Sequence, residues 1–171
     1  MISLLSRFLG RLAPFVPGGF NVRPVIHRWR GAKIGKHVWI SQYVYLDELH
    51  PEGITIGDNC TIGLRTSIFT HFYWGPRRAQ NGYEKVSIGN NTFIGPHCVI
   101  MPGVKVGEGC VIKAGTVLTR DVPDRAFWGN PSPGPLAEVT VPLTPEFSYD
   151  QFLKGLRPFR KAPNGKATGA D

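Results

Sequence analysis

Cysteine is scarce in this 171-residue chain, and so are long apolar runs. Cys60, Cys98 and Cys110 show no C-x-x-C or other close pairing, which excludes a zinc cluster on paired cysteines and a disulfide framework. Free thiols fit a reducing, cytoplasmic location. No stretch approaches the roughly 20 apolar residues that span a bilayer. The chain is instead rich in turn formers, with 21 Gly and 15 Pro, which suit many short strands joined by tight turns.

Acidic residues are missing from the first 46 positions, which hold seven Lys and Arg. The body from 47 to 150 is mildly acidic and no nucleic-acid-reading motif is present, so the sequence argues against nucleic acid as a partner. In the amino-terminal segment, 1–30, apolar residues share one face at helical spacing: Ile2, Leu5, Phe8, Leu9 and Leu12. We expect a basic amphipathic helix that covers the open end of the domain, and membrane-surface contact is the alternative.

Aliphatic residues recur every six positions, and this period decides the fold. They stand at Ile34, Ile40, Leu46, Ile56, Ile62, Ile68, Ile88, Ile94, Ile100, Val106, Ile112 and Leu118. A second small or β-branched residue follows four positions later, at Val38, Val44, Cys60, Thr66, Thr92, Cys98, Val104, Cys110 and Thr116. An α-helix of period 3.6 cannot hold this pattern. It predicts a prism-shaped coil of three short strands and three turns, with coils stacked about 4.8 Å apart and both residue classes pointing inward.

Glycine follows the aliphatic residue in six of these hexads: Gly35, Gly57, Gly63, Gly89, Gly95 and Gly107. A corner there needs either a small residue or an unusual backbone angle. The three cysteines fall in the second inward position, where Val or Thr stands in other hexads, so we interpret them as packing residues.

The runs IGDNCTIG, IGNNTFIGPHCVIMPGVKVGEGCVIKAGTVLTRDVP and GNP resemble the hexapeptide-repeat acyltransferases. Within that superfamily the sequence is most similar to the maltose and galactoside O-acetyltransferases and the colanic-acid type of polysaccharide acetyltransferase. The resemblance covers roughly residues 31 to 132. It implies an all-β, left-handed parallel β-helix over 31–135, preceded by segment 1–30. A carboxyl-terminal extension, 136–171, follows, and we expect a short helix within 145–161.

The repeat is interrupted twice, at 47–53 and by the loop 70–85. Such interruptions indicate segments with a role other than coil stacking. His71 opens the larger loop beside Tyr73 and Trp74. The resemblance implies that His71 is the catalytic base, because the family has a T-H pair at this place. A neutral imidazole is suited to take a hydroxyl proton near pH 7. Candidates to orient its other ring nitrogen are Glu84 and either acid of the first break, Asp47 or Glu48, and a backbone carbonyl would serve as well.

The resemblance further implies transfer of an acetyl group from acetyl coenzyme A, without a metal, to a saccharide hydroxyl in surface polysaccharide or glycolipid assembly. It places the coenzyme in a groove between subunits of a homotrimer. The matching residues here are Gly95, Pro96, Ala114, Thr119 and Arg120. Arg120 stands where the family usually has Lys. On the acceptor side we expect Phe93, Tyr73, Trp74 and Glu84, and Phe93 replaces a family Trp. A lipid-linked acceptor fits if the amino terminus contacts a membrane.

Three other functions remain open from the sequence. The acceptor could be an amine, as in N-acetylation of an amino sugar or an antibiotic. A zinc protein of the carbonic-anhydrase kind would need three histidines, but His97 has no partner at the required spacing, and both it and His37 fall at outward positions. A non-catalytic trimeric scaffold is the third alternative, since repeat folds often serve only for assembly.

Overall fold

The computed structural model describes residues 4–72, 83–130, 137–141 and 148–158. The chain divides into two compact units, Met1–Asn130 and Pro131–Asp171. The first unit begins with two helices, α1 (Leu4–Leu12) and α2 (Val22–Trp29). Its strands are β1 (Lys33–Ile34), β2 (Trp39–Ile40), β3 (Tyr45–Leu46), β4 (Ile54–Ile56), β5 (Thr61–Ile62), β6 (Ser67–Ile68), β7 (Val86–Ile88), β8 (Phe93–Ile94), β9 (Val99–Ile100), β10 (Lys105–Val106), β11 (Val111–Ile112), β12 (Val117–Leu118) and β13 (Phe127–Trp128).

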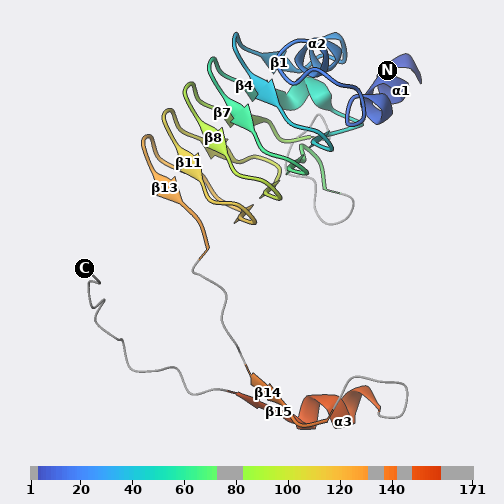
Figure 1. The fold of residues 1–171 in the computed structure, drawn as a ribbon, viewed down its shortest axis with the longest axis vertical. Coiled ribbons are helices and arrows are strands. Elements are labelled where there is room, and N and C mark those ends of the chain that lie inside the picture. Colours follow the sequence, from blue (N-terminus) through green and yellow to red (C-terminus); the bar gives the residue numbers. More distant parts are fainter. Residues whose placement is uncertain (1–3, 73–82, 131–136, 142–147, 159–171) are drawn as a thin grey trace. The chain divides into compact units, whose positions relative to one another are not determined.

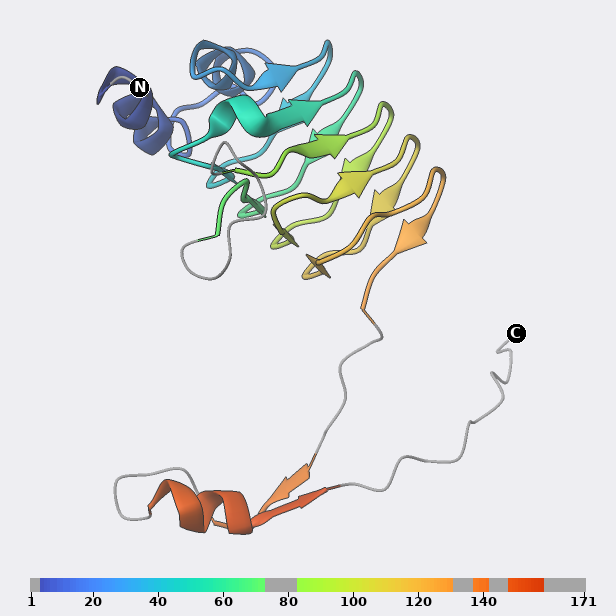
Figure 2. The same ribbon diagram turned by 180° about the vertical axis from the view of Figure 1, so that it is seen from behind.

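These strands wind into stacked three-sided coils, with the two helices at the amino-terminal end (Figures 1 and 2). Face A holds β1, β4, β7 and β10; face B holds β2, β5, β8, β11 and β13; face C holds β3, β6, β9 and β12. All neighbours within a face pair in parallel, and equivalent hexads are in register, as Ile40 with Ile62 and Ile62 with Ile94. The predicted left-handed parallel β-helix with short helical segments is confirmed.

Both predicted classes of inward residue form the core. Every member of the two classes is at most 3% exposed except Ile34, which lies half-buried in the first coil. Cys60, Cys98 and Cys110 are buried free thiols in this core, as their hexad position predicts. Burial raises the pKa of the Cys60 and Cys98 thiols, so these two favour the protonated form.

The glycines after the aliphatic residues allow close approach of successive coils. A Cβ added to Gly63 would lie 2.5 Å from the Gly95 carbonyl carbon, and one added to Gly95 would lie 2.5 Å from Ala114 N. The left-handed backbone angles occur instead two positions after these glycines, as at His37 (φ 54°) after Gly35 and His97 (φ 57°) after Gly95. Of the two reasons considered from the sequence, the need for a small residue is therefore the one that applies to Gly63 and Gly95.

Three arginines close the open end of the coil. Each coil donates its backbone N–H groups to carbonyls of the next coil, as from Trp39 to Cys60 (2.8 Å), so the carbonyls of the first coil have no coil before them. Arg28 donates to Ile34 O on face A (2.9 Å). Arg23 donates to Ile40 O on face B (2.6 Å). Arg30 donates to Leu46 O (3.3 Å) and Asp47 O (2.7 Å) at the end of face C. A carbonyl buried without a donor would cost about 1–3 kcal/mol, so the buried contacts of Arg23 and Arg30 stabilise faces B and C, whereas the Arg28 contact on face A is exposed.

His27, a buried residue of α2, completes this cap. Its ring is 1% exposed, and its Nδ1 accepts a hydrogen bond from Arg30 (2.9 Å). Burial, and then the charges of Arg30 and Arg23, lower the pKa of His27 to about 3. The imidazole is therefore neutral at pH 7, as its role as an acceptor from a guanidinium requires.

The helix α1 does not bury its apolar face, contrary to the sequence expectation. Leu5, Phe8 and Leu12 are 63%, 58% and 41% exposed, whereas Ser6 is buried. The reason is Arg30, whose guanidinium lies against this helix: a Cβ at Gly10 would be 2.8 Å from its Cζ. Only small residues fit there, so α1 packs with its small face and α2, which contacts β1 and β2, covers the open end. Ile2 lies outside the described residues.

The second unit contains β14 (Ala137–Val139), α3 (Tyr149–Lys154) and β15 (Leu156–Pro158), with β14 and β15 antiparallel. The short helix expected within 145–161 is therefore present as α3. The β-ladder beside it was not predicted. Among the described residues, no helix combines the length and the apolar character needed to cross a membrane.

Candidate active site

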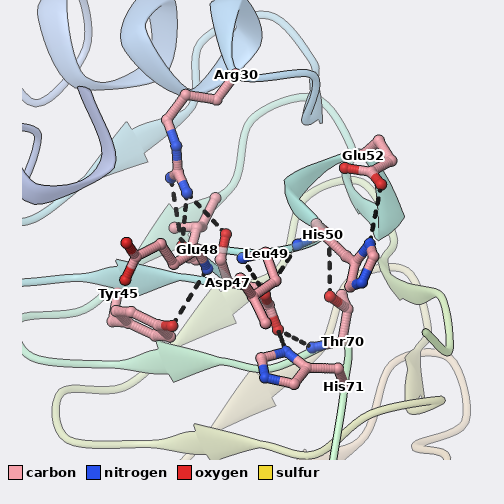
Figure 3. Close-up of polar contacts among 10 residues, drawn as sticks. Arg30, Tyr45, Asp47, Glu48, Leu49, His50, Glu52, Thr70 and His71 are labelled. Carbon is pink, nitrogen blue, oxygen red and sulfur yellow. Dashed lines mark hydrogen bonds and ion pairs between the residues drawn. The ribbon is translucent and has the colours of Figure 1, made fainter. Parts of the chain in front are cut away.

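Asp47 is the first residue after β3, where the chain leaves face C, and its side chain is fully buried. Its Oδ1 accepts the backbone N–H groups of Leu49 (2.9 Å) and His50 (3.0 Å), which shapes the short bulge that leads to the 3-10 turn Pro51–Gly53. Its Oδ2 accepts the N–H of Thr70 (2.8 Å) from the next coil (Figure 3). The carboxylate therefore ties together the two breaks in the repeat.

These hydrogen bonds keep Asp47 ionised. Burial by itself raises the pKa of the carboxyl, but the N–H groups of Thr70 and His50, together with His71, outweigh it and hold the pKa below its usual value. A carboxylate that accepts several N–H bonds is stabilised in its charged form even without solvent. Asp47 is thus a negative charge at neutral pH.

His71 contacts this charge directly. Its Nδ1 lies 2.6 Å from Asp47 Oδ2, and its side chain is 7% exposed (Figure 3). Because an ionised carboxylate can only accept hydrogen bonds, Nδ1 carries the proton and donates a hydrogen bond to Asp47. In the neutral ring the lone pair is then on Nε2, which makes Nε2 the basic nitrogen. Of the three acids considered from the sequence, Asp47 is the one that holds Nδ1 of His71.

His50 and Tyr83 form an aromatic wall beside this pair, and the sequence analysis did not single out either of them. The His50 and Tyr83 rings stack at 4.8 Å with an interplanar angle of 16°, and the His50 ring lies 6.2 Å from that of His71. Thr70 fixes the arrangement, since its Oγ1 donates to His50 O (2.9 Å). The only sequence signal was their position inside the two breaks.

Glu84 closes the larger loop on the other side. Its N–H donates to Thr70 O (2.6 Å), and its carboxylate lies against the backbone of Gly103, where a Cβ would be 2.5 Å from Oε2. Glu84 Oε1 is buried and has no hydrogen-bond partner within the described part of the chain. A buried polar atom without a partner is uncommon in folded proteins. The predicted residues Tyr73 and Trp74 lie outside the described residues.

The residues predicted to bind coenzyme A lie along both edges of face C. Gly95, Pro96 and Ala114 lie at the corner between faces B and C, where Gly95 packs directly against Ala114 of the following coil. Thr119 and Arg120 follow β12 at the corner between faces C and A, the same corner as His71 two coils earlier. Both are exposed. At about 4.8 Å per coil, this is a separation of roughly 10 Å along the axis.

Two predicted residues have surroundings that the sequence did not indicate. The Arg120 guanidinium lies 5.4 Å from the centre of the Trp128 ring, a cation–π contact at the carboxyl-terminal end of the coil. Phe93, predicted for the acceptor side, is 43% exposed on face B, whereas His71 follows a strand of face C. Phe93 and His71 of the same subunit therefore do not share a face.

Metal-binding groups do not gather in the described ranges: no three His, Cys, Asp or Glu side chains there are placed to hold one ion. His37 and His97 are exposed at equivalent corners.

Sequence comparison places these observations in a family. Residues 85–120 match the family model "Bacterial transferase hexapeptide (six repeats)", and residues 53–69 match "Hexapeptide repeat of succinyl-transferase". The chain is 37% identical over 118 residues to the "Putative acetyltransferase SAS0727" of Staphylococcus aureus, covering 68% of this chain and 71% of that protein. It is 42% identical over 100 residues to the "Putative acetyltransferase YvoF" of Bacillus subtilis, covering 58% and 56%.

A solved structure has the same fold. The hexapeptide-repeat acetyltransferase VCA0836 of Vibrio cholerae, in complex with acetyl coenzyme A, superposes with a TM-score of 0.53 at 24% identity over 70% of this chain and 77% of that one. The chain therefore belongs to the hexapeptide-repeat acyltransferase superfamily, as the sequence predicts. It spans only about half the length of several curated relatives that it matches, including YvoF.

Proposed function

We propose that this protein transfers an acetyl group from acetyl coenzyme A to a hydroxyl group of a saccharide, with His71 as general base. The observation that carries the proposal is the buried Asp47–His71 pair, because it gives one imidazole a fixed tautomer at the mouth of the larger loop. The names of the relatives, and the ligand named for the Vibrio structure, support acetyl coenzyme A as the donor.

The proposed reaction needs one base and one oxyanion site. Nε2 of His71 takes the proton of the acceptor hydroxyl while its oxygen forms a bond to the thioester carbonyl carbon. The resulting tetrahedral oxyanion collapses, the C–S bond breaks, and the imidazolium returns the proton to the coenzyme A thiolate. Asp47 stabilises the transient imidazolium through its ionised carboxylate, and no acyl-enzyme is formed.

The placement of the predicted coenzyme residues favours a homotrimer with shared sites. Gly95, Pro96 and Ala114 line one edge of face C, and His71 and Arg120 lie at the other edge. In a cyclic trimer, one edge of each subunit would meet a different edge of its neighbour, because such interfaces are heterologous. An extended pantetheine arm could then contact backbone from one subunit while its thioester reaches His71 of the next. Phe93 would serve the neighbouring site.

The acceptor side supports a polyhydroxylated ligand. Glu84 offers a buried acceptor oxygen, and the half-buried Tyr83 ring, stacked on His50, offers an aromatic surface of the kind on which sugar rings pack. A neutral hydroxyl also depends on a strong base more than an amine does, since free amine is nucleophilic without prior loss of a proton. We therefore place O-acetylation of a saccharide, free or carried on a lipid, before N-acetylation.

The test is thiol release from acetyl coenzyme A with a panel of saccharides, lipid-linked saccharides, nucleotide sugars and amines. His71→Ala should lose at least two orders of magnitude in rate, the usual contribution of a general base. The matched control is His37→Asn, at an exposed corner whose left-handed φ of 54° asparagine tolerates. Release that depends on a saccharide and vanishes only in His71→Ala would support the proposal. Release with amines alone, or equal rates in both variants, would contradict it.

A further inference from the structure

The amino-terminal helix α1 exposes four of its large apolar side chains and packs with its small ones, while Leu9 lies half-buried. Leu4, Leu5, Phe8 and Leu12 are 84%, 63%, 58% and 41% exposed. The opposite side of the helix carries the buried Ser6 and, after the last turn, Ala13, which is 0% exposed. The contact with Arg30 fixes this orientation, because its Nε donates to Ser6 O (3.1 Å). An apolar surface of this kind on one helix indicates a binding face rather than a packing face.

The positive charge beside this apolar face indicates an anionic partner. Arg7 and Arg11 are exposed on the same helix, and the first 46 residues contain no acid. Leucine and phenylalanine on one side of a short helix, with arginine beside them, are typical of helices that lie in the interface of an anionic membrane. Arginine can extend to lipid phosphates while the apolar side chains enter the acyl region. A protein partner would have to desolvate the arginines as well as cover the leucines.

We propose that α1 binds the surface of an anionic bilayer through Leu4, Leu5, Phe8 and Leu12, with Arg7 on the headgroup phosphates. The helix lies in the interface and does not cross it. Nine residues at 1.5 Å each give a length of roughly 14 Å, about half of the hydrocarbon core.

Two contacts connect the docked helix to the Asp47–His71 pair. Arg30 bonds Ser6 O of α1 and, through its other nitrogens, Leu46 O and Asp47 O (3.3 and 2.7 Å). Arg11 of α1 lies 3.2 Å from Glu48, the residue next to Asp47. Figure 3 shows Arg30 reaching the backbone on one side of Asp47 while His71 contacts its carboxylate on the other. Membrane binding by α1 therefore holds the segment that orients His71 close to the bilayer surface.

The test is cosedimentation of the full chain with phosphatidylcholine vesicles that contain increasing fractions of phosphatidylglycerol. We expect binding that rises with the anionic fraction and weakens with salt, because exposed charges are screened. The double variant Leu5→Ser/Phe8→Ser should bind at least about tenfold more weakly, since it removes two inserted side chains. Arg7→Gln should weaken binding to anionic vesicles about fivefold, as roughly 1 kcal/mol per basic residue predicts.

Phe127→Ser is the matched control, because Phe127 is 77% exposed on β13, at the other end of the coil. It should bind vesicles as the wild type does, and all variants should keep the wild-type melting temperature, since the substituted side chains are exposed. Wild-type protein that stays in the supernatant at every lipid composition, or a double variant that binds like the wild type, would overturn the proposal. Vesicle binding needs no turnover, so the result can be interpreted even if the proposed acetyl transfer fails.

Discussion

Replacing Asp47 with asparagine tests whether the His71 tautomer is set as described. The carboxylate accepts two N–H groups on Oδ1, from Leu49 and His50, and two on Oδ2, from Thr70 and His71. An asparagine must turn its NH2 toward one of these pairs. Facing Leu49 and His50 it would meet two backbone donors that cannot change, so the favoured orientation places NH2 toward Thr70 and His71.

In that orientation His71 can relieve the clash by moving its proton. Nδ1 becomes the acceptor from the asparagine NH2, and the proton moves to Nε2, which then cannot accept one from a hydroxyl. We expect kcat in Asp47→Asn to fall by about two to four orders of magnitude, the full contribution of a general base. KM should change little, because Asp47 is 0% exposed and cannot contact a substrate.

The assay is thiol release with the best acceptor, together with a cycle that includes His71→Ala. Because Asp47 acts through His71, the double variant should be no slower than His71→Ala alone. Thr70 N–H would lose its acceptor in Asp47→Asn, so unfolding free energy should drop by about 1–3 kcal/mol, and rates must be compared below the melting temperature of the variant. An Asp47→Asn protein that is folded and works within threefold of the wild-type rate would refute this account of the tautomer.

Other substitutions test the fold and its pH dependence. Arg30→Met should lower the unfolding free energy in urea by about 3 kcal/mol, because it leaves buried carbonyls without donors, whereas Arg28→Met, at an exposed site, should cost less. Gly63→Ala should cost about 2 kcal/mol or more by forcing two coils apart, against about 1 kcal/mol for Gly115→Ala, where the cost is the left-handed φ of 72° alone. The pKa of His27 is lowered in the folded chain, so between pH 6.5 and about 3 the unfolded chain binds a proton that the folded chain does not. The unfolding free energy should therefore fall as pH drops through this range. The variant His27→Asn should flatten this decline.

The period of six was enough to predict most of the core. It specified which residues point inward on every strand, because a prism with two inward positions per hexad leaves no alternative register. The buried thiols of Cys98 and Cys110 followed from the same rule. The interruptions of the period also indicated where the candidate site lies, since Asp47 and His71 stand in the two breaks, but the period could not show how their side chains are arranged.

The Asp47–His71 contact was among the options open from the sequence but could not be chosen. Asp47, Glu48 and Glu84 are all acids in the two breaks, and a loop does not reveal its side-chain directions. The register of face C narrows the choice, because Leu46 pairs with Ile68, so Asp47 is the first residue beyond the strand on the same corner as His71. Glu48 instead points to Arg11 of α1. Strand pairing on face C thus favours Asp47 over Glu48 as the partner of His71.

The basic amino-terminal segment shows why net charge alone does not identify a partner. The carbonyls of the first coil accept hydrogen bonds from Arg23, Arg28 and Arg30. In any parallel β-helix these carbonyls have no preceding coil to donate to them. Arg7 and Arg11 of α1 remain exposed, and they accompany an apolar face that the guanidinium of Arg30 keeps away from the domain. Each of these five arginines adds one positive charge, but only those of α1 lie beside the exposed apolar side chains of that helix. Arg7 and the exposed side chains of Leu4, Leu5, Phe8 and Leu12 lie together on one helix, and that coincidence is the physical basis for proposing that α1 binds a membrane.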